Sequence, residues 1–472
     1  MSQNADRGFY PVTGPYWTPA GEGSVWASLI LAFPLEKHGQ ELGSLPPQAV
    51  LELKRRGQTA RFLPDEQPPS PVWPGVLAAR FQVECKRWDS YRMLGKRWET
   101  AWMSLPRSCR ADDPDRSPET PPEFLILSDL QLLPLIASTI PAAMDRHLKD
   151  PVDGVLFAGD MVTHPERRED WWGDSTGRSF FDLTSPVASP GLLATSLLIP
   201  CPGNHDISSA YGATAEERFD NVKPDDWNLR VYSHLFPLPR HSAAFQELRR
   251  NVAGPGIGPS DYYANRLGDV WIGSLFVTRA YVSGNHDACT GPAYESPGRF
   301  IFEPVTMGSP QYRWLEEQLR SPACRSARVR IVLMHHGIYA QGHSALPPFG
   351  YPPDYEEDLL VRDLVPLLKE GCVDLVVNGH NHIVNHRIVD GIHYVESSHT
   401  GVTYQPYKRL PDGEWSPEPW GHPSRLLMHE PDTGFFSILH TNGVGRLQTF
   451  RVDPGGRGAV SLVDETVLDF TF

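Results

Sequence analysis

The chain has 472 residues, of which 40% are hydrophobic and 21% are charged, and its formal net charge at pH 7 is −14. This length is sufficient for a large core and for two or more folded units. The acidic balance argues against a general affinity for the backbone of DNA or RNA, so we expect no nucleic-acid partner.

The ends and the cysteines of the chain indicate where the protein works. No basic start followed by an apolar run occurs near Met1, and no apolar stretch approaches the ~20 residues that span a bilayer. We therefore expect neither a signal peptide nor a membrane partner. The six cysteines form no C-x-x-C pair and are too few for a disulfide scaffold, so we interpret them as mostly buried thiols in a reducing compartment. These features predict a cytoplasmic protein, and none of them assigns an oligomeric state.

The first part of the chain, residues 1–115, is expected to form a small N-terminal β-rich domain. Apolar stretches with strand character lie at 25–31, 49–53 and 76–83, and Pro-rich turns separate them. Residues 116–123 are rich in Pro and read as a linker, because such a segment resists packing.

From residue 124 onward, strands alternate with helices, which predicts an α/β layered core over residues 124–472. The predicted strands lie at 124–128, 153–158, 192–199, 329–334, 373–377 and 392–395. The predicted helices lie at 136–148, 311–319 and 359–368. Residues 262–267 and 270–277 predict a hairpin that turns at Gly268-Asp269, the irregular segment at about 207–259 predicts a cap over the site, and 434–472 predicts C-terminal antiparallel strands.

Five polar clusters each follow a predicted strand, where functional residues of open α/β sheets gather. They are Asp129-Leu130-Gln131, Gly159-Asp160, Gly203-Asn204-His205-Asp206, His335-His336 and Gly379-His380-Asn381-His382. A pair of divalent ions needs a bridging carboxylate together with neutral donors, and these residue types supply both. Asp160 suits the bridge, and alternate residues such as His380 and His382 share one face of an extended segment. Of the two adjacent histidines we favour His335 as the ligand, since it comes first after its strand; His336 is the alternative.

The order of these clusters over residues 124–400 resembles the calcineurin-like metallophosphoesterase superfamily. The resemblance implies an α/β (α+β) fold, a four-layer sandwich of two mixed β-sheets flanked by helices. It implies two metal sites whose ligands are Asp129, Gln131, Asp160 and His382 for one ion, and Asp160, Asn204, His335 and His380 for the other. It also implies that His205 lies near the phosphate as general acid or transition-state stabiliser, and that Asp206 orients it.

Two departures from the superfamily pattern bear on the metal. Gln131 stands where most members have His, and a harder amide oxygen favours Mn²⁺ or Mg²⁺ over Zn²⁺. We expect two divalent ions and favour Mn, with Fe, Mg or Zn as alternatives. A subset of the superfamily, including manganese-dependent phosphohydrolases, is similar in carrying Gln at this position. Thr163 occupies the place of the tyrosine ligand of purple acid phosphatases, whose N-terminal β unit this chain resembles in position, so a purple Fe³⁺ centre is not expected.

Four further residues are candidate substrate contacts, each with a plainer interpretation. His286 belongs to a second Gly-Asn-His-Asp tetrapeptide that also reads as an Asn-rich turn, and His343 also reads as a solvated loop histidine. Arg167 would meet a phosphate or form a solvated charge pair with Arg168. Trp171 would stack on a base or pack on the core.

The sequence thus predicts a metal-dependent phosphoesterase that hydrolyses a small phosphomonoester, phosphodiester or pyrophosphate, nucleotide-like if Trp171 stacks on a base, by attack of a metal-bridging hydroxide. A nuclease is the alternative enzyme, and the acidic balance counts against it. A catalytically degenerate binding protein of the same fold is the alternative of another class, and only Gln131 supports it.

Overall fold

The computed structural model describes most of the chain. The described residues are 10–21, 23–32, 49–110, 121–130, 142–143, 145–146, 149, 151–173, 179–187, 191–208, 228–253, 261–280, 299–300, 304–339, 360–380, 382, 384–397, 424–428, 434–442, 444–452 and 460–470. Gln131, His286 and His343 lie outside them, as do residues 116–120 of the predicted linker, residues 209–227 and 254–259 of the predicted cap, and most of the predicted helix 136–148.

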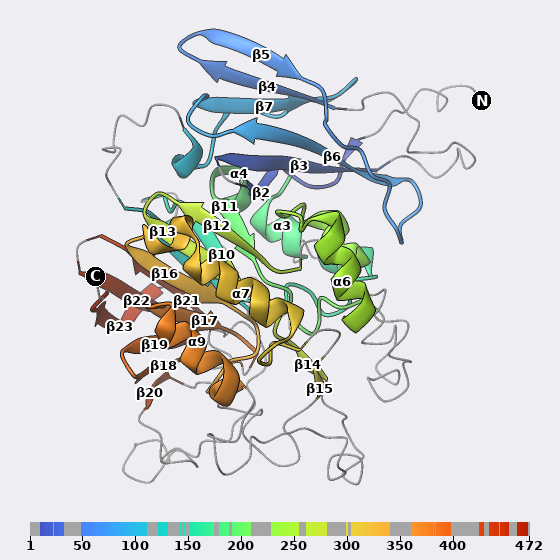
Figure 1. Ribbon diagram of the computed structural model, residues 1–472. Helices are drawn as coiled ribbons and strands as arrows, with labels where there is room; N and C mark the ends of the chain where they lie inside the picture. Colours follow the sequence, from blue (N-terminus) through green and yellow to red (C-terminus); the bar gives the residue numbers. More distant parts are fainter. Residues whose placement is uncertain are drawn as a thin grey trace.

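Two mixed β-sheets form the body of the protein (Figure 1). The first has ten strands, in the order β1 (Tyr10–Pro11), β3 (Ser24–Ala32), β2 (Tyr16–Gly21), β11 (Leu197–Pro200), β10 (Gly154–Phe157), β9 (Glu123–Leu127), β21 (Gly434–His440), β22 (Gly445–Val452) and β23 (Val460–Leu468), with β6 (Val76–Glu84) paired to β3. The second has seven, in the order β12 (Tyr263–Leu267), β13 (Val270–Ser274), β16 (Val329–Leu333), β17 (Leu375–Asn378), β19 (Ile392–Ser397), β18 (Val384–Val389) and β20 (Ser424–Met428).

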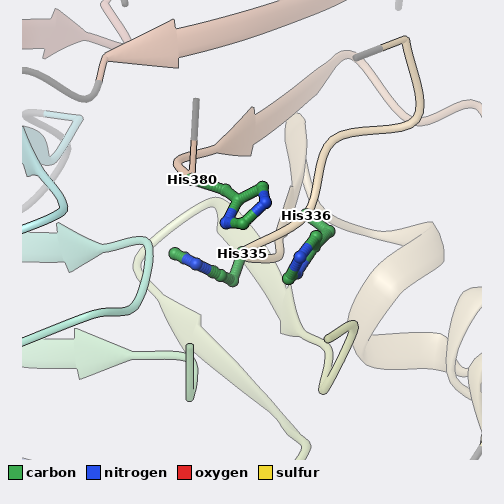
Figure 2. Close-up of side chains that lie close together, drawn as sticks. All are labelled: His335, His336 and His380. Atoms are coloured by element: carbon green, nitrogen blue, oxygen red, sulfur yellow. The ribbon is translucent and has the colours of Figure 1, made fainter. Parts of the chain in front are cut away.

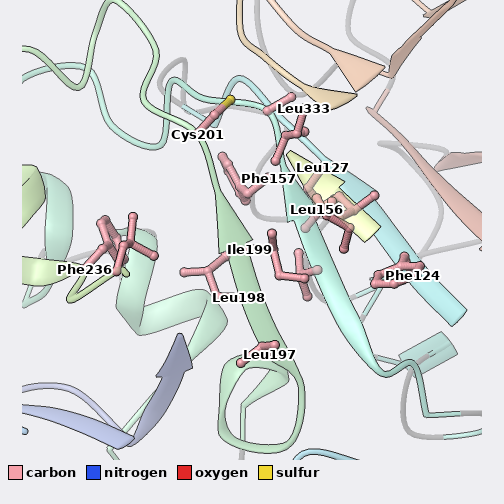
Figure 3. Packing of buried hydrophobic residues seen from close by; sticks show 14 of the residues in the cluster. Phe124, Leu127, Leu156, Phe157, Leu197, Leu198, Ile199, Cys201, Phe236 and Leu333 are labelled. Atoms are coloured by element: carbon pink, nitrogen blue, oxygen red, sulfur yellow. The ribbon is translucent and has the colours of Figure 1, made fainter. Parts of the chain in front are cut away.

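The core lies between these sheets and is built from short apolar strands. β9, β10 and β11 run parallel, and every residue of β10 and β11 is buried. A strand buried on both faces reads as a continuous apolar run, which is why these segments were predictable. Figure 3 shows Phe157 and Leu127 in the same apolar cluster as Leu333 of β16, so side chains of both sheets meet there. The predicted strands 124–128, 153–158, 329–334 and 373–377 are confirmed.

The predicted strand 192–199 is wrong in its first half. Leu192–Thr195 is the short helix α4, and the strand β11 begins only at Leu197. A short apolar run does not by itself distinguish a buried helix from a buried strand. The carbonyl of Ala194, near the end of this helix where carbonyls lack an intrahelical partner, accepts hydrogen bonds from Trp17 Nε1 at 3.1 Å and Tyr91 Oη at 2.7 Å. Tertiary partners therefore support the helix.

Helices cover the second sheet. The predicted helix at 311–319 is confirmed as α7 (Pro310–Arg320), where Ser309 caps the first turn by accepting from the amide of Tyr312 at 3.2 Å. The predicted helix at 359–368 is a π-helical turn, η7 (Leu360–Leu364), followed by α9 (Val365–Glu370). In Figure 1, α7 and α9 lie over the face of this sheet. Within the described ranges, no helix combines the length and the apolar character needed to cross a membrane.

The N-terminal β-rich region is present as predicted, and it is continuous with the core. Part of this region forms a separate four-stranded sheet in the order β5 (Gln58–Phe62), β4 (Val50–Arg55), β7 (Ser90–Leu94) and β8 (Met103–Ser104). β2 pairs in parallel with β11, so β1, β2, β3 and β6 extend the first main sheet. Tyr16 Oη donates to the carbonyl of Leu235 at 2.6 Å, and an Arg80 guanidinium nitrogen donates to that of His234 at 2.5 Å. Within the predicted cap, the helix α5 (Arg230–Leu235) is therefore a packed part of the core.

Trp171, a candidate substrate contact, is instead a core residue. It closes α2 (Arg168–Trp171), is fully buried, and its ring lies within about 6 Å of those of Phe180 and Phe236. Its Nε1 donates to the carbonyl of Pro165 at 2.9 Å. A ring enclosed on all sides offers no face to a base, so the stacking role is wrong.

Replacing Trp171 with Ala is expected to lower the free energy of unfolding by about 3–5 kcal/mol, because it leaves a large cavity among aromatic rings. Urea denaturation monitored by circular dichroism measures the change. Trp102→Ala is the matched control, since that indole is 38% exposed and its loss should cost far less. Equal losses for the two variants would contradict this packing.

A histidine–carboxylate pair links two neighbouring strands of the first sheet, β9 and β21. His440 of β21 lies opposite Glu123 of β9, and His440 Nδ1 is 2.6 Å from Glu123 Oε1. This hydrogen bond raises the pKa of His440 in spite of its burial. Burial would raise the pKa of Glu123, yet the same bond holds it below its usual value.

A histidine with a raised pKa stabilises the fold below its unfolded pKa of about 6.5 and loses that effect as the pH rises through the folded pKa. At pH 6, His440→Gln is therefore expected to lower the free energy of unfolding by about 1.5–3 kcal/mol. The difference from the unmodified protein should shrink by pH 9, as urea titrations at both pH values would measure. A difference that is independent of pH would exclude the charged pair.

Candidate metal centre

Six of the seven predicted metal ligands converge where strands of the two sheets end. They are Asp129 after β9, Asp160 after β10, Asn204 after β11, His335 after β16, and His380 and His382 after β17, and all six are buried. The seventh, Gln131, lies outside the described residues. The carboxyl ends of the parallel strands thus bring together residues separated by as many as 253 positions, as the rule for open α/β sheets requires.

His335 stands at the middle of the cluster. Its Nε2 is 3.2 Å from Asp160 Oδ2 and 2.9 Å from Asn204 Oδ1, and its Nδ1 is 2.7 Å from the carbonyl oxygen of Ala158. The carbonyl fixes the ring and directs Nε2 at the carboxylate and the amide, an arrangement typical of histidines that bind metals. Ligand atoms of Asp129, Asp160 and His335 all lie within 4.8 Å of one another.

His336 also belongs to the cluster. Figure 2 shows His335 and His336 on one loop and His380 on another, with the three rings close together. Ligand nitrogens of these three histidines lie within 4.8 Å of one another, and the His336 and His380 ring centroids are 3.7 Å apart. His336 is tethered by its amide, which donates to the carbonyl of Val277 at 3.1 Å. His335 contributes to both groups of ligand atoms, whereas His336 contributes to one.

The backbone is strained where the ligands sit. Among the described residues, eight that are not glycine have positive φ, and four of these are predicted ligands: Asp129 (56°), Asp160 (55°), His380 (80°) and His382 (55°). Such conformations cost free energy and gather at functional sites. Glycines clear the adjacent space, since a Cβ on Gly159 would lie 2.6 Å from His335 Nδ1, and one on Gly379 would lie 2.6 Å from Asp129 Oδ2.

His205 and Asp206 make hydrogen bonds with different partners. His205 Nδ1 lies 3.2 Å from the carbonyl oxygen of Thr163, and the His205 amide donates to Asp160 Oδ1 at 2.8 Å. The Asp206 carboxylate accepts hydrogen bonds from the amides of Gly203, Asp160 and Met161 at 2.8–3.0 Å. The expectation that Asp206 orients the His205 ring is thus corrected: Asp206 holds two ligand-bearing loops against each other, and a carbonyl orients the ring.

The electrostatics of the cluster are those of buried, interacting charges. Burial would raise the pKa of Asp160, but His335 and His205 hold it well below its usual range. Burial would lower the pKa of His335, yet the Asp160 carboxylate raises it to about 9. Burial lowers the pKa of His205, and burial together with the charge of Asp160 raises that of Asp206 to about 7.

This donor set fits divalent cations. Asp129 and Asp160 bring two carboxylates into a region of low dielectric, where like charges destabilise each other unless positive charge lies between them. The Asp160 carboxylate favours a proton on His335, and a bound cation would take the place of that proton. Carboxylate, amide and imidazole donors together suit Mn²⁺, Fe²⁺ and Zn²⁺.

Some contributors to this site carry no sequence signal. The carbonyls of Ala158, Thr163 and Val277 orient the three histidines His335, His205 and His336, but any residue has a carbonyl. Ser128 Oγ contacts Asp129 Oδ2, and its place directly before the first ligand is a signal that could have identified it. Arg167 is half-buried in the loop after Asp160, and its contact with substrate stays a prediction.

Comparison with known proteins identifies the fold. The structure of a purple acid phosphatase, PPD1 from yellow lupin (Lupinus luteus) seeds, superimposes with a TM-score of 0.58 at 13% identity, covering 97% of this chain and 74% of that one. The structure of PhoD superimposes with a TM-score of 0.56 at 13% identity, covering 100% of this chain and 94% of that one. At this identity the likeness is one of fold. No curated protein sequence matches the chain.

The family profile of calcineurin-like phosphoesterases matches residues 122–384, more than half of the chain, and this stretch holds every predicted metal ligand. The chain belongs to the calcineurin-like phosphoesterase family.

Proposed function

We propose that this protein is a dinuclear metal-dependent hydrolase of small phosphate esters. The observation that carries the proposal is the convergence of two buried carboxylates, Asp129 and Asp160, with an amide and three imidazoles at the strand ends of a phosphoesterase fold. Asp160 lies beside His335 and within 4.8 Å of a ligand atom of Asp129, which supports a role for its carboxylate in both metal sites. A degenerate, binding-only protein would not need to keep this whole donor set.

The residues around the ions divide the work. Bound there, two divalent ions would activate water and neutralise charge on the phosphate. Asp129 and His382 would hold one ion, with Gln131, and Asn204, His335 and His380 the other, with Asp160 shared. His205 Nδ1 faces a carbonyl acceptor, so in the neutral ring Nδ1 carries the proton and Nε2 is the nitrogen that exchanges one. We assign His205 the transfer of a proton from Nε2 of its protonated ring to the leaving oxygen, after which the neutral ring would regain a proton from water, and we assign Asp206 the positioning of the backbone.

The substrate class is a small phosphomonoester, phosphodiester or pyrophosphate. With Trp171 in the core, the aromatic support for a nucleotide is withdrawn. The net charge of −14 still counts against a nuclease. We propose Mn²⁺ as the metal, with Fe, Mg or Zn as alternatives, and a panel of aryl esters, pyrophosphate and an oligonucleotide tested with each ion would measure both preferences. Cleavage of the oligonucleotide faster than every small ester would overturn the small-substrate assignment. A cytoplasmic location stays a prediction.

Asp160→Asn is expected to reduce hydrolysis of bis(p-nitrophenyl) phosphate with Mn²⁺ by more than about 100-fold, because even outer partners of metal ligands are worth 10–100-fold. The bound metal, measured by elemental analysis, should also fall. Asp390→Asn is the matched control, since Asp390 is exposed and has a similar φ of 51°. Full turnover by Asp160→Asn would refute the shared carboxylate.

Separate His335→Gln and His336→Gln variants distinguish the two adjacent histidines. Because His335 touches both Asp160 and Asn204, its loss is expected to weaken metal binding and abolish turnover. Loss of His336 is expected to retain two ions and to reduce turnover less. Manganese titration followed by calorimetry measures the two affinities, and the reverse order of effects would transfer the ligand role to His336.

A further inference from the structure

The loop that orients His205 is compact and bonded within itself. It runs from Thr163, whose carbonyl faces His205 Nδ1, to the end of α2. The amide of His164 donates to Asp170 Oδ2 at 2.8 Å, and the amide of Arg167 donates to the carbonyl of His164 at 3.0 Å. A displacement of any part of this loop would therefore be transmitted to the Thr163 carbonyl. We call residues 163–172 the histidine loop.

The histidine loop is held from two sides by tryptophans. On one side Trp171, within the loop, is inserted in the aromatic core and donates to the carbonyl of Pro165. On the other side Trp73, which belongs to the N-terminal region between β5 and β6, donates from Nε1 to the carbonyl of Glu166 at 2.8 Å. The Trp73 ring also packs edge-on against Trp172, with centroids 4.8 Å apart. Trp73 is only 8% exposed, so its hydrogen bond is shielded from water.

Several other buried hydrogen bonds of the N-terminal strands reach different elements. Tyr16, Thr18 and Arg80 bond to carbonyls at residues 234–237, while Trp17 and Tyr91 bond to that of Ala194. Those carbonyls belong to the core scaffold. Trp73 differs, because its acceptor lies three residues from the carbonyl that orients the proposed proton donor.

We propose that Trp73 is a positioning residue through which the N-terminal β region holds the histidine loop, and with it the His205 ring, in the orientation for proton transfer. The proposal rests on the role of His205 in the proposed function. Through Trp73, the N-terminal region would contribute to the reaction without contacting the substrate. The chemistry affected is the step in which the leaving oxygen receives a proton.

A positioning role and a merely stabilising role predict different kinetics. If the His205 ring is misaligned, an ester with a poor leaving group, which needs the proton, is slowed more than one with a good leaving group, which does not. A general loss of folded protein would slow both equally. Trp73→Phe removes the N–H donor and keeps an aromatic ring against Trp172, so it isolates the hydrogen bond.

The experiment compares phenyl phosphate and p-nitrophenyl phosphate esters in the Mn²⁺-loaded enzyme. Trp73→Phe is expected to lower kcat for the phenyl ester by about tenfold, a fraction of the 10²–10⁴-fold that general acid catalysis supplies, and to change kcat for the p-nitrophenyl ester and both KM values little. His205→Ala should show the same dependence on the leaving group, larger in size. In the His205→Ala background, Trp73→Phe should have no further effect, since both act on one step.

A second readout does not depend on turnover. Hydrogen–deuterium exchange of the metal-free protein is expected to quicken in peptides covering residues 163–172 when Trp73 becomes Phe, and to stay unchanged in β9 and β10. Trp102→Phe is the matched control, because Trp102 lies in the same N-terminal region, on the surface between Lys54 and Arg92.

The outcomes separate the inference from the function on which it rests. Unchanged exchange in the histidine loop, or an equal fall in kcat for both esters, overturns the role of Trp73 alone. If His205→Ala itself shows no dependence on the leaving group, then the proton-transfer role of His205 is wrong and the inference is overturned with it. If Asp160→Asn abolishes hydrolysis while Trp73→Phe quickens exchange in the histidine loop and leaves kcat for both esters unchanged, the proposed function stands. Trp73 then has only a structural role, and the inference is overturned.

Discussion

The burial of two carboxylates, Asp129 and Asp160, is the constraint on which the centre of this structure depends. A buried charge is tolerated only when hydrogen-bond donors and opposite charge surround it. Here the amide of His380 donates to the Asp129 carboxylate at 3.0–3.1 Å, and the amide of His205 donates to the Asp160 carboxylate at 2.8 Å. To turn these groups inward, the chain accepts left-handed backbone at four of the ligands, and it places glycines where a Cβ would collide with them. The burial of these carboxylates and the backbone strain beside them therefore have the same origin.

The strand ends make this arrangement attainable. Each loop that carries a candidate ligand follows a parallel strand whose register is fixed by apolar packing on both faces. The loops therefore begin at defined positions along the strand direction. Asp206 then ties the second and third loops together by accepting three backbone hydrogen bonds. A carboxylate used in this way is not interchangeable with an amide, because an amide nitrogen cannot accept. The precision of the centre comes from the packed strands together with this one carboxylate.

The sequence predicted the ligands better than it predicted their surroundings, for a physical reason. Residue types, their order and their place after apolar runs are written in the linear sequence, so the six described candidate ligands lie together as expected. The carbonyls that orient the histidines have no side-chain signature and were missed. Leu192–Thr195 was misassigned because a short, mainly apolar segment is compatible with a helix or a strand until Trp17 and Tyr91 bond to the carbonyl of Ala194. The sequence left two roles open for Trp171, because an aromatic side chain in a polar segment fits a pocket wall and a core anchor equally well, and only its burial decides for the core.

The place of the N-terminal region follows from the same bonds. A β-rich segment joined by a Pro-rich linker suggests a unit that could be removed, but β2 pairs with β11, and Tyr16 and Arg80 satisfy carbonyls of the core. Removing the region would expose the edge of β11 and leave buried carbonyls without donors, each at a cost of about 1–3 kcal/mol. Deletion would therefore report on folding and would say little about catalysis. Single side-chain changes at the contact between this region and the loop after Asp160 keep the sheet intact, and they are the means by which a contribution to the reaction can be separated from a contribution to stability.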